Sequence, residues 1–316
     1  MHVELDNNRL DDHFPLVIDL LSYFRHPDWS KLPGPINSYN PYYFKNCDST
    51  ALIVTVGDSW TWGQDLCGYN ELLDIQTCDW QVVNGILSNI NSDRFEKSYG
   101  NLLSQHFNSD WLNLAVPGWG NYQMAGLVKN LADIIPYLHY DKILVVVTLT
   151  EVGRWFNTHV DVNIDHQKLF HKLHHPTQLL ERLNSIVVDD ITACLNKFSH
   201  VKLLVGTNFV DHIGLDNLLP EQRLFKPWYQ LLDIRFDTPV YTLNQLAWSN
   251  FLRGIGDDMI PSKLHSMFKP WIMEISDKTN TLVERLQASP YITTTYHPLP
   301  ISHKIWAEYI VKYLRC

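Results

Sequence analysis

The sequence predicts an α/β fold built on a mostly parallel β-sheet. Short apolar runs rich in β-branched residues recur along the chain, and longer segments that read as helices separate them. This alternation is typical of parallel strands joined by right-handed crossovers, with helices on both faces of the sheet. The chain has 316 residues and a hydrophobic fraction of 45%, which is enough to bury a full core as one unit.

The strands are expected where the apolar runs are short and end near a glycine or a proline. These runs cover residues 51–56, 111–115, 142–148 and 201–205. The helices expected between and after them cover residues 95–108, 122–138, 177–198, 264–288 and 301–315. Ligands of parallel sheets lie beyond the carboxyl ends of the strands, so we expect a functional site in the loops that follow these runs.

The chain divides into an arm and a main domain. Residues 1–48 hold several prolines and many aromatic residues, which predicts an extended N-terminal arm packed on the domain formed by residues 49–316. Within this domain, stretches at about 65–94, 151–176 and 208–260 are too long for ordinary connections. Because each follows a strand end, we expect the three insertions to form a cap on one side of the sheet.

Charge and cysteine usage bound the partners and the compartment. The net charge of −9 argues against nucleic acid or an anionic membrane as the main partner. The five cysteines are odd in number and lack close paired spacing, which favours a reducing compartment. The chain shows neither a signal peptide nor an apolar run long enough for a membrane span. We therefore expect a cytoplasmic protein, and the oligomeric state is left open.

The most informative segment runs from Val56 to Gly63, where a strand ends in glycine and Ser59 follows two residues later. A serine at such a turn is exposed at the top of the sheet, beside backbone N–H groups that can hold an oxyanion. The alternative is that Ser59 only caps a helix. A nucleophilic serine needs a base, and His297 is the candidate because it lies on a loop just before the last helix.

These segments together resemble the SGNH (GDSL-type) hydrolases. The resemblance covers the core from about residue 51 to residue 314 in block order. It rests on Gly57-Asp58-Ser59-Trp60, on Gly118 within the block Asn113–Asn121, and on His297-Pro298 followed by His303–Ala307. It implies a three-layer α/β/α sandwich with a mostly parallel, flavodoxin-like sheet. It also implies ester hydrolysis through an acyl-serine intermediate, with no cofactor and no metal.

By position, the resemblance makes Ser59 the nucleophile and His297 the base. The backbone N–H groups of Ser59 and Gly118 would hold the oxyanion, although a glycine after a strand can also be a plain turn. The third block of the family usually supplies an asparagine to the oxyanion hole. The nearest residue here is Glu151, whose carboxylate would repel the oxyanion, so Thr150 or Asn121 is expected to donate instead.

A second departure concerns the residue that orients the base. The family usually has an aspartate three residues before the histidine, and this chain has Thr294 in a run of three threonines. Loss of the acid from a serine triad lowers turnover by roughly four orders of magnitude in a site built around it. We expect that no carboxylate contacts His297 Nδ1 and that a backbone carbonyl from residues 293–295 orients the ring.

The remaining candidates concern substrate binding. Arg154 can bind a substrate carboxylate or pair with an acid such as Glu151. Trp60 and Trp119 are candidates to stack on a substrate, and the alternative for any tryptophan is core packing. A histidine cluster at residues 166–175 lacks the glutamate of a helical zinc motif, so we expect a polar cap segment there.

Two functions from different classes follow. The first is a serine esterase that acts on a small-molecule or carbohydrate ester, with a short acyl group such as acetyl as the preferred substrate. The second is a catalytically weakened or inactive binding or structural protein on the same fold. The retained Ser59, Gly118 and His297 favour the enzyme, whereas the missing aspartate and asparagine favour the alternative.

Overall fold

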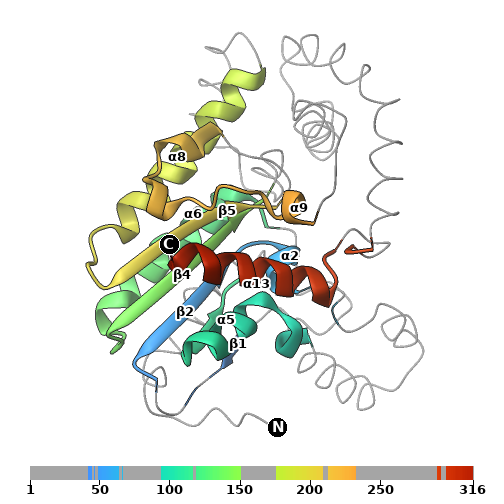
Figure 1. Cartoon of the computed structure of the whole chain (residues 1–316). Helices are drawn as coiled ribbons and strands as arrows, with labels where there is room; N and C mark the ends of the chain where they lie inside the picture. The colour runs from blue at the N-terminus through green and yellow to red at the C-terminus, as the bar shows by residue number, and fades with distance from the viewer. Residues whose placement is uncertain are drawn as a thin grey trace, which may run out of the picture.

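The computed structural model describes residues 42–44, 46, 49–63, 66, 94–116, 119–150, 176–208, 213–232, 290–292 and 297–315. These residues contain a five-stranded sheet with the order β1-β3-β2-β4-β5 (Figure 1). Its strands are β1 (Tyr42–Phe44), β2 (Ala51–Val56), β3 (Asp110–Asn113), β4 (Lys142–Leu149) and β5 (Val201–Thr207). All neighbouring pairs are parallel except β1 with β3. The prediction of an α/β fold on a mostly parallel sheet is therefore confirmed.

Helices connect the strands and follow the last of them. The α-helices are α2 (Ser59–Trp62), α5 (Tyr99–Phe107), α6 (Asn121–Ile134), α8 (Pro176–Leu195), α9 (Trp228–Leu231) and α13 (Pro300–Arg315). Short 3-10 helices are η4 (Ile135–Tyr137), η6 (Ile213–Asn217) and η7 (Pro220–Gln222). Figure 1 shows α5 and α13 on the viewer's side of the sheet. Among the helices of the described residues, none is long and apolar enough to cross a membrane.

The apolar side chains of the sheet divide into two clusters because successive residues of a strand point to opposite faces. In β2, Leu52, Val54 and Val56 join a cluster that includes residues of α6 and α8. Ile53 joins a second cluster, which includes residues of α5, α9 and α13. Both faces of β2 are therefore buried, which explains why its sequence is a continuous apolar run.

The register of the sheet places the carboxyl ends of its parallel strands side by side. Thr55 of β2 lies opposite Asn113, the last residue of β3. Leu149, the last residue of β4, lies opposite Thr207, the last residue of β5. The segments after β2, β4 and β5 therefore begin close to one another, and Ser59 is in the first of them.

Within the described residues, each expected strand and helix is observed, and its two ends differ from the expected ends by four residues or fewer. The helix expected at 95–108 is interrupted at Ser98, which adopts an extended backbone and precedes α5. The helix expected at 122–138 changes to a 3-10 turn at Ile135, before Pro136. Strand β1 was not expected, because a three-residue edge strand has too few residues to show a period. The helix expected at 264–288 lies outside the described residues.

The prediction that the three insertions form a cap can be compared with the structure only for part of the third insertion. Residues 151–175 and nearly all of 65–94 lie outside the described residues. In the described part of the third insertion, Leu215 of η6 joins the cluster of α6 and α8. The chain then runs along β5, where Leu224 N donates to Val205 O, and Trp228 of α9 joins the other cluster. This insertion therefore crosses from one face of the sheet to the other at the β5 edge.

Candidate active site

Ser59 begins α2 directly beyond the carboxyl end of β2. The helix N-cap is Asp58, whose side chain accepts a hydrogen bond of 3.0 Å from the backbone N–H of Trp60. The helix ends after one turn at Gly63, which has a left-handed backbone with a φ of 84°. The interpretation of Ser59 as the cap is therefore wrong: Asp58 caps the helix, and the Ser59 hydroxyl is left for another contact.

His297 supplies that contact from the other end of the chain. Its Nε2 lies 3.1 Å from Ser59 Oγ, although the two residues are 238 positions apart in the sequence. His297 is half-buried and immediately precedes Pro298, which forms an isolated bridge with Ile292. The expected juxtaposition of hydroxyl and imidazole is confirmed as a distance, and the catalytic roles of both residues stay predictions.

His303, the other histidine of the last block, has a different environment. It lies in α13 and is completely buried, and its Nδ1 accepts a 3.2 Å hydrogen bond from the backbone N–H of Tyr99. Its ring stacks on Tyr99 and meets the Trp228 ring edge-on. Burial lowers the pKa of His303 to about 3, so the ring is neutral at physiological pH. These contacts make His303 a core residue that fixes α13 against α5.

The expected oxyanion donors are only partly described. Gly118 lies outside the described residues. Asn121, the first residue of α6, forms two hydrogen bonds of 2.9 Å with the backbone of Thr150, accepting from its N–H and donating to its carbonyl. Asn121 thus holds the residue that follows β4 against the start of α6. Direct donation by Asn121 or Thr150 to an oxyanion stays a prediction.

The expected orientation of His297 and the Arg154 contact fall outside the described residues, because these omit 293–296 and 151–175. The two tryptophans proposed for substrate stacking are described, and both pack in the core. Trp60 is 2% exposed and its ring meets Trp228 edge-on at 5.4 Å. Trp119 is also buried and belongs to the cluster of α6 and α8. Both rings are buried, and their contact with a substrate stays a prediction.

Asn208 was not singled out from the sequence, and it contacts Asp58, the residue before Ser59, in the candidate site. It directly follows β5, is completely buried, and its Nδ2 donates a 2.8 Å hydrogen bond to Asp58 Oδ1. The signal that points to it is its position after a parallel strand, where ligands and site residues gather. An asparagine in a loop carries no further motif, so position alone did not distinguish it.

A buried pair of hydroxyl groups, one of them close enough to Asp58 to interact with it electrostatically, lies near the candidate site. Tyr99 Oη and Thr148 Oγ1 lie 3.2 Å apart, and both residues are completely buried. Burial raises the pKa of Tyr99 to about 12, so its hydroxyl stays protonated. The Arg94 guanidinium lies 3.3 Å from the centroid of the Trp62 ring, a cation–π contact at the last residue of α2.

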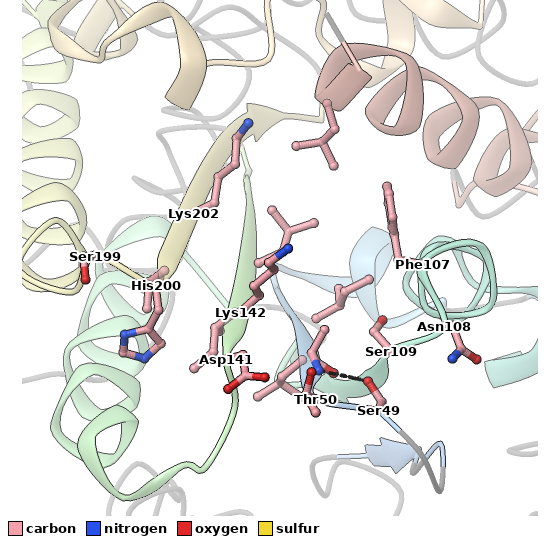
Figure 2. A pocket seen from close by; sticks show the side chains of 17 residues that line it. Ser49, Thr50, Phe107, Asn108, Ser109, Asp141, Lys142, Ser199, His200 and Lys202 are labelled. Carbon is pink, nitrogen blue, oxygen red and sulfur yellow. Dashed lines mark hydrogen bonds between the residues drawn. The ribbon is translucent and has the colours of Figure 1, made fainter.

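A cavity of about 990 Å³ lies at the amino ends of the parallel strands, on the opposite side from the carboxyl ends and Ser59 (Figure 2). It is lined by residues at the amino ends of the strands, including Thr50, Lys142 and Lys202. Phe107 and Asn108 face these lysines across it. Because Ser59 follows the carboxyl end of β2, this cavity does not belong to the candidate active site.

Among the described residues, no group of three or more histidine, cysteine or acidic side chains is arranged to hold a metal ion. The histidine cluster at residues 166–175 is outside that set. A scan of the chain against models of known protein families finds no matching family, and a search among curated proteins finds no matching relative. The functional interpretation therefore depends on the motifs of this chain and on the geometry of the site.

Proposed function

We propose that this protein is a serine hydrolase of SGNH type that cleaves an ester, with Ser59 as nucleophile and His297 as general base. The observation that carries the proposal is the 3.1 Å separation of Ser59 Oγ and His297 Nε2 at the carboxyl edge of the sheet. A serine within hydrogen-bond reach of an imidazole is the basic requirement for an activated nucleophile. The distant positions of the two residues in the sequence make a chance local contact a poor explanation.

The reaction follows from these two side chains. His297 Nε2 takes the proton from Ser59 Oγ as the oxygen attacks the ester carbonyl, and it returns the proton to the leaving alcohol when the acyl–oxygen bond breaks. Water, deprotonated by the same nitrogen, then releases the acid and restores the serine. The backbone N–H groups of Ser59 and Gly118, with Thr150 or Asn121, are proposed to hold the oxyanion. A backbone carbonyl from residues 293–295 is proposed to orient the imidazole in place of the missing aspartate.

The fold proposed for the whole domain is a three-layer α/β/α sandwich with flavodoxin-like strand order. The order β3-β2-β4-β5 supports it, because β3 lies on one side of β2 whereas β4 and β5 follow on the other side. The two apolar clusters on opposite faces of β2 also support it. A short acyl group on a carbohydrate is the proposed substrate class, as the resemblance implies.

Labelling with a fluorophosphonate probe, followed by mass spectrometry, tests the function. We expect labelling at Ser59 in the folded protein, no labelling there in Ser59→Ala, and at least a hundredfold slower labelling in His297→Ala, because the base is lost. Ser104→Ala is the matched control: Ser104 is a buried serine of α5 that donates to Asn101 O, and its loss should leave labelling of Ser59 intact. A folded wild-type protein that the probe does not label would favour the binding-protein alternative.

A further inference from the structure

We propose that Asn208 is a positioning residue for the nucleophile, acting through the side chain of Asp58. The inference rests on the proposed function, because it assigns Asn208 to the same site. It adds a residue from the end of β5, which lies outside the motif blocks that define the resemblance.

The contact is direct and completely buried. Asp58 Oδ1 accepts two hydrogen bonds, one of 2.8 Å from Asn208 Nδ2 and one of 3.0 Å from the backbone N–H of Trp60. Both Asp58 and Asn208 have exposed fractions of 0%. A buried carboxylate depends on its hydrogen-bond donors, since water does not replace them. Asn208 therefore fixes the side-chain torsion of the residue that immediately precedes Ser59.

Asn208 is itself rigidly held by its backbone. Its N–H donates to Leu149 O at 3.0 Å, which ties it to the end of β4. Its carbonyl accepts from Tyr229 N at 3.1 Å, which ties it to α9. Two core strands and a helix thus determine where the Asn208 amide lies, and that amide determines where Asp58 lies.

The position of Asp58 matters because the peptide between Asp58 and Ser59 carries one of the proposed oxyanion donors. A rotation of this peptide would move both the Ser59 N–H and the Ser59 Oγ relative to His297 Nε2. Misplacement of reacting groups by about 1 Å is enough to slow an enzymatic reaction by roughly 100-fold. The Asn208–Asp58 bond is therefore expected to act on the rate of nucleophilic attack through the position of Asp58.

Asn208→Ala tests the inference against a matched buried asparagine. The control is Asn101→Ala: Asn101 lies in α5, is also buried, and its Nδ2 donates to Glu96 O at 3.2 Å. We expect Asn208→Ala to slow fluorophosphonate labelling of Ser59 at least tenfold more than Asn101→Ala does. Labelling is measured under conditions in which both variants are shown to be folded. Amide hydrogen exchange at Trp60 N–H should also become faster in Asn208→Ala alone, because that N–H shares its acceptor with Asn208.

A second experiment swaps the side chains at positions 58 and 208. Asn208→Asp places a second carboxylate against Asp58, and we expect slower labelling and faster exchange at Trp60. Adding Asp58→Asn restores one donor and one acceptor to the pair, and we expect recovery of at least tenfold in the labelling rate. A structural loss elsewhere in the core would not be rescued by this exchange.

The outcomes separate the inference from the proposed function. If the wild-type protein is not labelled but the Trp60 exchange rates follow the expected pattern, Asn208 holds the start of α2 through Asp58, whereas the hydrolase function, and with it a role in positioning a nucleophile, is rejected. If Asn208→Ala and Asn101→Ala give the same labelling and exchange rates, the positioning role is overturned. Failure of the exchanged pair to recover Trp60 protection also overturns it.

Discussion

At Gly57 the chain has no room for a side chain. A Cβ atom there would lie 2.1 Å from Thr61 Oγ1 and 2.5 Å from Thr61 Cβ. Thr61 is itself buried in α2, so it cannot turn away into solvent. The glycine that ends β2 is therefore required by the close return of α2 onto the strand that precedes it.

We expect Gly57→Ala to lower the free energy of unfolding by about 1–3 kcal/mol, the usual cost of forcing extra volume into a packed core. The control is Gly206→Ala in β5, where the nearest side-chain atoms would be Leu224 Cδ1 and Trp306 Cζ2, both at 3.1 Å, a much smaller overlap than at position 57. Urea unfolding of both variants measures the difference. Equal losses of stability would contradict a specific clash between position 57 and Thr61.

Individual site residues could be predicted from the sequence where a motif specifies both the residue type and its position. It predicted the meeting of Ser59 and His297, because each belongs to a block of the family it resembles. It assigned the cap of α2 less well, since Asp and Ser are both good N-caps and only the backbone angles distinguish them. Asn208 was missed because its importance comes from a tertiary contact with Asp58, 150 positions away.

At the scale of elements, α5 packs on the sheet through Gly100 and Trp111 of β3. A Cβ atom at Gly100 would lie 2.3 Å from Trp111 Nε1 and 2.4 Å from Trp111 Cε2. The indole cannot move easily, because it is completely buried and its Nε1 donates a 3.0 Å hydrogen bond to Thr55 Oγ1. The absence of a side chain at position 100 thus sets the distance between α5 and the sheet.

Two effects of Gly100→Ala oppose each other. Replacing glycine with alanine contributes at most about 1 kcal/mol of stability through helix propensity, because Gly100 is the second residue of α5 and the full difference applies to a helix interior. Pushing α5 away from Trp111 costs about 1–3 kcal/mol or more, and we expect this clash to win. Urea unfolding should show net destabilisation of Gly100→Ala. Net stabilisation would mean that α5 can move away from Trp111 without a loss of packing energy, which would contradict the clash.

A double-mutant cycle isolates the clash. Trp111→Phe removes Cζ2, which would lie 2.6 Å from a Cβ at position 100, and leaves a smaller ring that can shift, at the cost of the bond to Thr55. In the Trp111→Phe background, Gly100→Ala should therefore be less destabilising than in the wild type, with a coupling free energy of about 0.5–3 kcal/mol. Additive effects of the two changes would reject the contact as the cause.

The elements themselves were largely predictable, and the reason is burial. Strands such as β4, which is covered on both faces over most of its length, produce apolar runs that stand out in the sequence. Strand β1 has three residues and pairs with β3 only at the sheet edge, so no local pattern indicates it. Its position follows from contacts such as the 2.7 Å bond from Asn46 N to Asp110 Oδ1, which tertiary structure alone provides.

At the scale of the whole molecule, the buried His303 links stability to pH. The ring of His303 contacts those of Tyr99 and Trp228 and is completely buried, so water cannot solvate a positive charge on it. Protonation at Nδ1 would also remove the acceptor of the Tyr99 N–H. Its Nε2 is buried and has no hydrogen-bond partner among the described residues. Burial of the ring lowers the pKa of His303 in the folded state to about 3, against an ordinary value of 6.5.

The sign of the linkage follows from proton binding. Between pH 6.5 and about 3 the unfolded chain protonates this histidine and the folded chain does not. Stability from the neutral His303 is therefore fully present above pH 6.5 and is lost as the pH falls toward 3, by up to about 1.4 kcal/mol per pH unit. Between pH 7 and pH 5 the loss from this residue alone should be about 2 kcal/mol.

His303→Asn isolates this contribution from those of the other histidines. Asparagine retains an acceptor near the position of Nδ1 for the Tyr99 N–H, and it does not titrate. We expect the variant to be less stable than the wild type at pH 7, because the smaller side chain leaves a cavity beside Trp228. We also expect its stability to fall by about 2 kcal/mol less than that of the wild type between pH 7 and pH 5. Urea unfolding at both pH values measures this difference, and equal losses in the two proteins would show that His303 is protonated in the folded state well above pH 3.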